Sequence, residues 1–156
     1  MPAGRAGVRT AIVALAPSVH GEGDKGFVPR LITIARTKGI SAYIGDGSNR
    51  CPTVHRLDAA HLFRLALEAA PAEARLAGVG DEGVPFRDIA TVIGHRLNLP
   101  IISIARAEAG AHFGALGAIA GLDVPRSSIQ AQELLGWRPV HPGLIADLEQ
   151  GRYFDH

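Results

Sequence analysis

Residues Val8–Gly23 read Val-Arg-Thr-Ala-Ile-Val-Ala-Leu-Ala-Pro-Ser-Val-His-Gly-Glu-Gly, and this stretch decides the fold. The part before Pro17 is a nearly unbroken apolar run, and small or polar residues follow it. Such a run is typical of a strand that is buried on both faces, as in a parallel sheet. A buried helix is the competing interpretation, but the run is short and Pro17 would end a helix. The sequence therefore predicts an α/β protein with residues 8–16 inside a parallel sheet.

The residues just after this strand are the first candidates for a functional site. In open α/β sheets, ligands bind in the crevice beyond the carboxyl ends of the parallel strands. Here that point is occupied by Pro17, Ser18, Val19 and His20. A neutral imidazole can exchange protons near pH 7, which makes His20 the candidate for proton transfer. The alternative is a loop histidine that hydrogen-bonds only to the backbone.

Length and composition describe an ordinary globular protein. The chain has 156 residues, 47% of them apolar and 20% charged, which suits a single domain over residues 1–156. The net charge is +1 and the basic residues are scattered, so we expect neither nucleic acid nor an anionic membrane as a partner. No run reaches the roughly 18 apolar residues of a membrane span. The start of the chain imitates a signal peptide weakly, and we expect a cytoplasmic protein.

Metal and disulfide chemistry are not expected. Cys51 is the single cysteine, so an internal disulfide and a cysteine-based zinc site are excluded, and the side chain is interpreted as a small core residue. The seven histidines are scattered without the spacing of metal ligands.

Further along the chain, helical and extended patterns alternate. We expect helices over residues 27–38, 59–70, 85–98 and 108–119, and a short one that stops at Gly136. Short strands are expected over residues 40–44, 75–80 and 101–104, and an extended connector over residues 50–57.

Several details of these helices follow from capping and periodicity. Asp58 is the expected N-cap of the helix over residues 59–70, and Ser127 with Gln130 forms a capping-box pattern. Trp137 is interpreted as a core anchor. The inner face of the helix over residues 59–70 is predicted from its 3.6-residue period to consist of Ala59, Leu62, Phe63, Ala66, Leu67 and Ala70.

Short motifs along the chain resemble, in the same order, those of one known family. They are Pro17-Ser18-Val19-His20-Gly21, Phe27-Val28-Pro29-Arg30-Leu31, Tyr43-Ile44-Gly45-Asp46-Gly47 followed by Arg50, Val54 and Asp58-Ala59-Ala60, and Leu135-Gly136-Trp137-Arg138-Pro139. These motifs resemble the C-terminal, substrate-binding portion of the extended short-chain dehydrogenase/reductases, the NAD-dependent epimerase/dehydratase family. Each motif alone is weak, but the set keeps its order over most of the chain.

The resemblance implies a fold and a function. The fold would be a partial Rossmann-like parallel sheet with the helical substrate-binding lobe of that family. The function would be an NAD(P)-linked oxidoreductase or epimerase-type enzyme that acts on a small carbonyl or hydroxy compound. The family's contacts to the nicotinamide end of the cofactor would fall on Pro17, Ser18 and Val19. The substrate pocket would involve His20, Phe27, Arg30 and Arg50, with Arg50 gripping an anion, and His55 in the connector is a further candidate for facing it.

Two of the family's motifs do not occur in this sequence. Neither the Gly-x-x-Gly-x-x-Gly cofactor fingerprint nor the Tyr-x-x-x-Lys pair is present. The resemblance therefore implies a truncated domain that binds NAD or NADP weakly. The alternative is a catalytically silent binding module that keeps only the substrate pocket. Since the strand over residues 8–16 would lack neighbours, we also expect a homo-oligomer.

Overall fold

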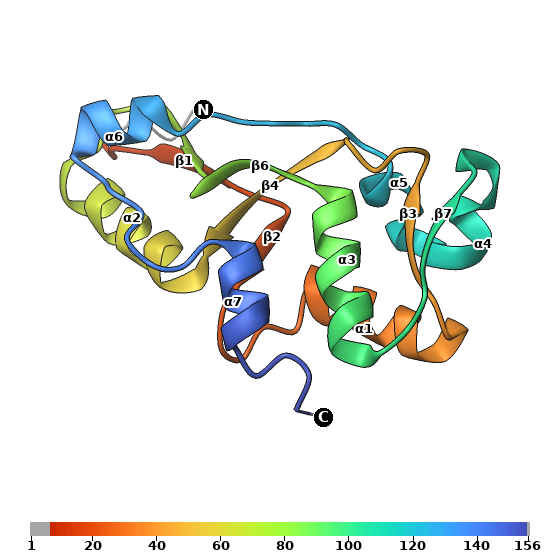
Figure 1. Cartoon of the computed structure of the whole chain (residues 1–156). Coiled ribbons are helices and arrows are strands. Elements are labelled where there is room, and N and C mark those ends of the chain that lie inside the picture. The colour runs from red at the N-terminus through yellow and green to blue at the C-terminus, as the bar shows by residue number, and fades with distance from the viewer. Residues whose placement is uncertain (1–6, 156) are drawn as a thin grey trace.

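The computed structural model describes residues 7–155, which form a mixed α/β fold (Figure 1). The elements follow one another in the order β1 (Ala11–Leu15), β2 (Ser18–His20), α1 (Phe27–Lys38), β3 (Ser41–Ile44), β4 (Arg50–His55), α2 (Arg56–Ala69), β5 (Ala74–Gly78), β6 (Asp81–Pro85), α3 (Phe86–Leu97), β7 (Ile101–Ile104), η2 (Arg106–Glu108), α4 (Ala109–Phe113), η3 (Gly114–Leu116), α5 (Gly117–Ala120), α6 (Ile129–Leu135) and α7 (Leu144–Gln150). No described helix is long and apolar enough to cross a membrane.

The strands form three small sheets. β1 pairs with β5, β2 with β4 and β3 with β7, and all three pairs are parallel. β6 adds an antiparallel strand beside β4. The predicted α/β class with fragments of parallel sheet is therefore confirmed.

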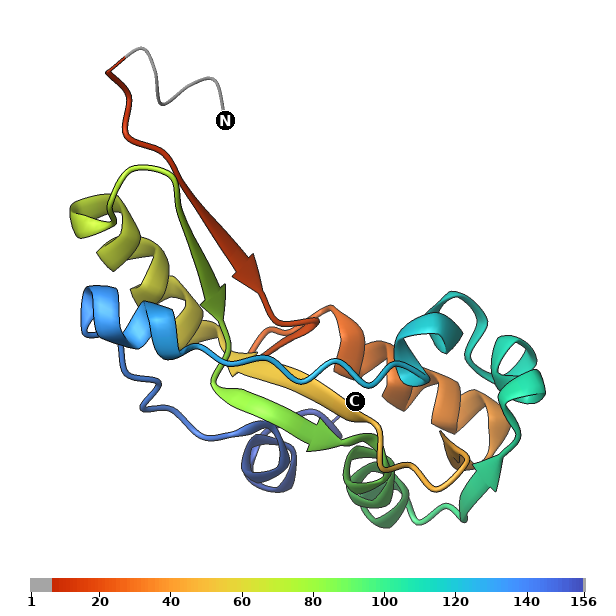
Figure 2. The same cartoon turned by 90° about the horizontal axis from the view of Figure 1, so that it is seen from above.

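The elements divide between two apolar cores. At one end of the molecule α2 and α6 lie beside β1 and β5, and at the other α1 and α3 lie beside β3 and β7 (Figure 2). The first core includes Leu62, Leu76 and the fully buried Trp137, as predicted for the tryptophan. The second core is built around Val28, Phe86 and other side chains of α1 and α3.

The prediction that residues 8–16 form a strand buried on both faces is wrong. β1 covers only Ala11–Leu15, its residues are half-buried or exposed, and Leu15 is 39% exposed. Among the described residues β5 is its one strand partner, so its other edge is open. An apolar pattern records which side chains favour burial, but it does not say that neighbouring strands are present to bury them.

Residues 17–20, expected just beyond the end of a strand, include a second strand. Residues 18–20 form β2, which pairs in register with β4 so that His20 lies opposite His55. The expected connector over residues 50–57 is β4 followed by the first residues of α2. In a parallel pair, opposite residues present their side chains on the same face, and this register brings the two histidines together.

Most helix boundaries follow local signals. α1 covers the predicted residues and ends at Gly39, whose φ of 76° is left-handed. α3 also matches its prediction and ends at Asn98. The three predicted strands are found over Ser41–Ile44, Ala74–Gly78 and Ile101–Ile104.

The start and the inner face of α2 differ from the prediction. The helix begins at Arg56 and its N-cap is His55, while Asp58 lies inside the first turn and bonds elsewhere. Phe63 and Leu67 are 45% and 78% exposed, so the buried face is narrower than the periodicity indicated. Apart from Leu62, the buried apolar residues on that face are alanines.

Other differences lie in the C-terminal third. The helix expected over residues 108–119 is broken into short turns, with Gly114 at a left-handed φ of 60°. The N-cap position of α6 is Ser128, whose side chain makes no capping bond, while Ser127 Oγ accepts from the backbone N–H of Ile129. The predicted Ser127–Gln130 box is absent from this helix start, and Gln132 Nε2 donates to Ser128 Oγ instead. β6 and α7 were not predicted, although α7 packs against α3 and β4.

Candidate functional site: a cavity between β2, α2 and α7

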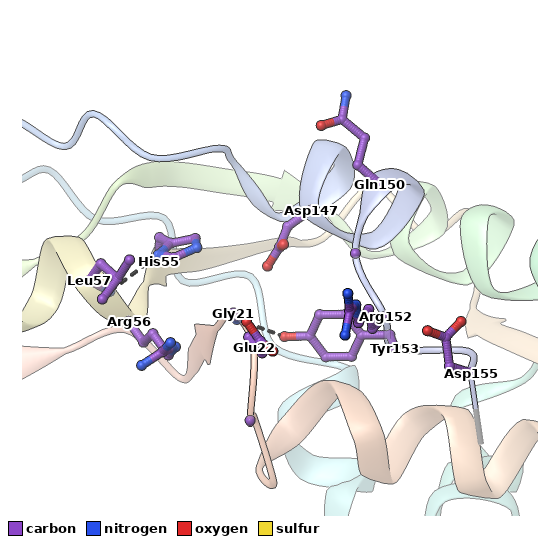
Figure 3. A pocket seen from close by; sticks show the side chains of 12 residues that line it. Gly21, Glu22, His55, Arg56, Leu57, Asp147, Gln150, Arg152, Tyr153 and Asp155 are labelled. Atoms are coloured by element: carbon purple, nitrogen blue, oxygen red, sulfur yellow. Dashed lines mark hydrogen bonds between the residues drawn. The ribbon is translucent and has the colours of Figure 1, made fainter.

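A cavity of about 780 Å³ opens where three distant segments meet. It is lined by residues 21–23 after β2, residues 55–57 at the junction of β4 and α2, and Asp147, residues 150–153 and Asp155 from α7 and the tail. Figure 3 shows His55, Arg56 and Leu57 on one side and Tyr153, Arg152 and Asp155 on the other, with Asp147 pointing between them. The size suits a small-molecule ligand.

One carboxylate of the cavity wall is backed by a buried histidine. Nδ1 of His20 lies 2.7 Å from Oδ2 of Asp147. His20 is only 1% exposed and does not line the cavity, whereas Asp147 does. A carboxylate accepts hydrogen bonds only, so the proton of this bond is on Nδ1. Nε2 of His20 is buried and has no partner among the described residues.

His55 is held by the helix that it caps. The backbone N–H of Leu57 donates to Nδ1 of His55 at 3.1 Å, which satisfies one of the free donors at the start of α2. Burial, followed by the nearby His20, lowers the pKa of His55 below its ordinary value. The ring is therefore a neutral imidazole at pH 7, with its proton on Nε2.

A third histidine extends the cluster. His141 stacks on His55 with ring centroids 4.8 Å apart, and His20 meets His55 edge-on at 5.4 Å. Nδ1 of His141 lies 2.7 Å from Oδ1 of Asp58. The three rings thus connect two carboxylates, Asp147 at the cavity and Asp58 at the base of α2.

Tyr153 closes the opposite side of the cavity. Its hydroxyl donates to Asp24 Oδ2 at 2.7 Å and accepts from the backbone N–H of Gly21 at 2.9 Å. Burial raises the pKa of Tyr153, and the bond to Asp24 raises it further. The phenol stays protonated, so it acts as a structural donor and not as a base.

The residues predicted to contact the cofactor do not line this cavity. Pro17 is exposed, Val19 is half-buried, and Ser18 is 1% exposed with an unpartnered hydroxyl. Pro17 and, in part, Val19 are therefore the side chains of this stretch that are accessible at the surface. The fit to a cofactor is therefore partial, because the sequence also lacks the glycine fingerprint that would hold the pyrophosphate.

The residues predicted to bind substrate are separated by the fold. His20 and His55 are brought together, but Phe27 is buried in the second core and Arg30 is exposed on α1. Arg50 forms a two-point bond with the carboxylate of Asp123, at 3.0 and 3.2 Å, away from the cavity. Its guanidinium is thus already occupied by a partner within the chain.

The sequence reasoning missed the contribution of the tail. Asp147, Arg152 and Tyr153 all come from α7 or from the residues after it. A signal was present, since Leu144 and Leu148 are spaced by one helical turn and both are fully buried. This spacing could have indicated a short helix, which was not predicted, but it could not have said which sheet the helix covers.

The described part of the chain contains neither a reactive cysteine nor a cluster of metal ligands. Burial raises the pKa of Cys51 to about 11, which leaves it a protonated, inert thiol. Residues 7–155 contain no group of three or more histidine, cysteine or acidic side chains placed to hold a metal ion.

The first comparisons with known proteins are comparisons of sequence. No family model matches the chain. An uncharacterized protein of Schizosaccharomyces pombe is 51% identical over 148 residues, which cover 95% of this chain and 50% of that protein. The chain spans about half the length of the curated relatives it matches.

Solved structures show the fold. A dTDP-glucose 4,6-dehydratase from Streptomyces venezuelae, with NAD and TYD bound, matches with a TM-score of 0.70 and 17% identity, over 96% of this chain and 45% of that one. A human epimerase family protein with NADPH matches with a TM-score of 0.61 and 25% identity, over 91% and 48%. The fold is that of the NAD-dependent dehydratases and epimerases. Within these neighbours it corresponds to less than half of each chain.

Proposed function

We propose that this chain forms the substrate-binding part of an NAD(P)-linked oxidoreductase or epimerase-type enzyme that acts on a small carbonyl or hydroxy compound. The observation that carries the proposal is Asp147, which lines the cavity and bonds to the buried His20 behind it. Fold neighbours that were solved with NAD or NADPH support it. The cofactor, when bound, supplies the hydride chemistry.

Asp147 is the group that we assign to proton transfer. It is accessible from the cavity, while His20 lies behind it and orients it through the 2.7 Å bond. A carboxylate held in this way can accept the proton of a substrate hydroxyl. His20, the sequence-based candidate, thus becomes a positioning residue.

Cofactor binding is the first test. Because residues 17–19 lie outside the cavity and no glycine fingerprint is present, we expect weak binding of NADH or NADPH. The Kd should lie near the millimolar level, a binding free energy of about −4 kcal/mol. Titration of the full chain, followed by nicotinamide fluorescence, measures it. No saturable signal with either cofactor at several millimolar would contradict the proposal.

The acid–base role is tested by Asp147→Asn, which keeps the size of the side chain and an acceptor for His20. We expect turnover of the bound nicotinamide with small carbonyl compounds to fall by about 10²–10⁴-fold. The control is Asp88→Asn, an exposed position on α3. Equal turnover in both variants would remove Asp147 from the mechanism.

A binding module without redox chemistry is the second candidate. The observation in its favour is Tyr153, whose hydroxyl is engaged with Asp24 and Gly21 and is not free for proton transfer. Ligand binding in the cavity without any cofactor binding would select this function.

A further inference from the structure

The junction of β4 and α2 presents an unused hydrogen-bond donor to the cavity. Nδ1 of His55 is occupied by the N–H of Leu57, so the ring proton is on Nε2. No described residue bonds to Nε2, and it is not one of the buried orphaned atoms. The cap thus fixes the tautomer and leaves a donor on a cavity-lining side chain.

The surroundings of His55 favour this state of the ring. Protonation of Nδ1 would break the cap, and it would place a charged imidazole between His20 and His141 at 5.4 and 4.8 Å. The groups that face these rings from other elements are Asp147 on α7 and Asp58 on α2, and each already bonds to one of the flanking histidines.

Arg56 adds a positive charge to the same wall. It is exposed, lines the cavity and forms no ion pair with any described residue. Its stem lies over Gly21, where a Cβ would stand 2.9 Å from Cγ of Arg56. Gly21, with a φ of 138°, therefore leaves the space that brings this side chain against the cavity.

The opposite side of the cavity carries one charge of each sign, from Arg152 and Asp155. Asp155 lies beyond Tyr153, away from the wall formed by His55 and Arg56 (Figure 3). A carboxylate there accepts hydrogen bonds from hydroxyl groups and repels a second anion. Donors on the wall of His55 and Arg56, with an acceptor at Asp155, suit a ligand with one carboxylate and at least one hydroxyl.

We propose that Nε2–H of His55 and the guanidinium of Arg56 together bind the carboxylate of a small hydroxy acid. The proposal rests on the proposed substrate cavity and names the class of substrate that it takes. A charge-assisted pair of donors on one wall discriminates an acid from its neutral amide.

The test uses the full chain with ¹⁵N-labelled histidine, titrated with L-lactate and with L-lactamide, its neutral isostere. We expect the His55 ring to show the Nε2–H tautomer, and its Nε2 signal to shift saturably with lactate in the millimolar range. Lactamide should bind at least about tenfold more weakly, a difference of about 1.4 kcal/mol. An Nδ1–H tautomer, or equal responses to the two probes, would overturn the proposal.

Variants separate binding from capping. His55→Asn keeps an acceptor for the Leu57 N–H, because asparagine is among the best N-caps, but it removes the donor in the cavity. We expect a cooperative thermal transition, because the cap is kept, and at least tenfold weaker lactate binding. Arg56→Gln should show the same loss of binding. His61→Asn and Arg64→Gln, both exposed on α2, are the controls.

Unchanged lactate binding in His55→Asn or in Arg56→Gln would overturn the inference. Its failure is distinct from failure of the proposed function. Cofactor binding without a lactate response contradicts this inference alone, whereas a lactate response without cofactor binding contradicts the redox function alone.

Discussion

Asp58 shows how a single buried carboxylate organises the base of the site. It accepts hydrogen bonds from the backbone N–H groups of Val140 and His141, at 3.0 and 3.1 Å, and from the ring of His141. Its backbone carbonyl also accepts from Nε1 of Trp137. The segment between α6 and α7 is thereby tied to α2, which holds α7 and Asp147 over β2.

The charge on Asp58 makes this attachment sensitive to acid. Burial by itself raises the pKa of Asp58, but the hydrogen bonds from His141 and Val140 outweigh it and the net pKa is lowered. A carboxylate with a lowered pKa in the folded state adds stability above its ordinary value of about 3.9, and that stability is lost as the pH falls below this value.

We therefore predict that the free energy of unfolding decreases as the pH falls below about 4. Asp58→Asn should cost about 1.5–3 kcal/mol at pH 7 and should flatten the pH dependence. Chemical denaturation at a series of pH values measures both. Asp88→Asn, exposed on α3, serves as the matched control and should leave the acid slope as it is.

At the scale of elements, the backbone conformation at a helix end decides where the helix stops. α1 and α6 both end at a glycine in the left-handed region, Gly39 with a φ of 76° and Gly136 with 64°. No other atom would contact a Cβ at either position, so the requirement for glycine comes from the backbone alone.

This predicts that replacing glycine by alanine has opposite effects on stability at two positions where the new Cβ meets no other atom. Gly39→Ala should destabilise the protein by about 1–2 kcal/mol because of its left-handed backbone. Gly110→Ala in α4, where φ is not positive and no atom lies within 4 Å of the new Cβ, should stabilise it by about 0.5–1 kcal/mol. Thermal unfolding of the two variants compares them directly, and equal signs would refute the backbone argument.

At the scale of the whole molecule, the open edge of β1 has a consequence for assembly. An exposed strand edge offers unpaired N–H and C=O groups for pairing with another chain. Apolar side chains are exposed around it, with Leu15 on β1 itself and Phe63 and Leu67 on α2. We propose that this face pairs with a second copy of the chain about a two-fold axis.

Light scattering at micromolar concentration should then give a mass of at least two chains of 16.4 kDa. Leu67→Glu should shift the distribution of measured masses towards that of the monomer, because it places a charge in the apolar contact. Leu122→Glu, which alters an exposed leucine outside β1 and α2, is the control. A stable mass of one chain for the unaltered protein would refute the proposal.

Only part of the candidate site was accessible from the sequence. His20 was identified because it follows an apolar strand, and His55 because it lies in an extended connector before a helix. The parallel register of β2 and β4 places them opposite each other. Asp147, 127 residues from His20, has no local pattern that links it to β2. Arg50 fits a family motif, but its role depends on whether Asp123 is nearby, and that is a property of the packed loop.

The sequence by itself determined what depends on neighbours within a few residues. The α/β class, the bounds of α1 and α3, the short parallel strands and the burial of Trp137 all follow from capping, periodicity and composition. Tertiary structure alone decided that β1 lies at an edge, that His55 and not Asp58 caps α2, and that α7 supplies the carboxylate of the cavity. The physical reason is that these features depend on distant partners: Ala74 of β5 lies 63 residues after Ala11 of β1, Val140 lies 82 residues after Asp58, and Asp147 lies 127 residues after His20. Sequence patterns record a preference for burial but not the partner that provides it.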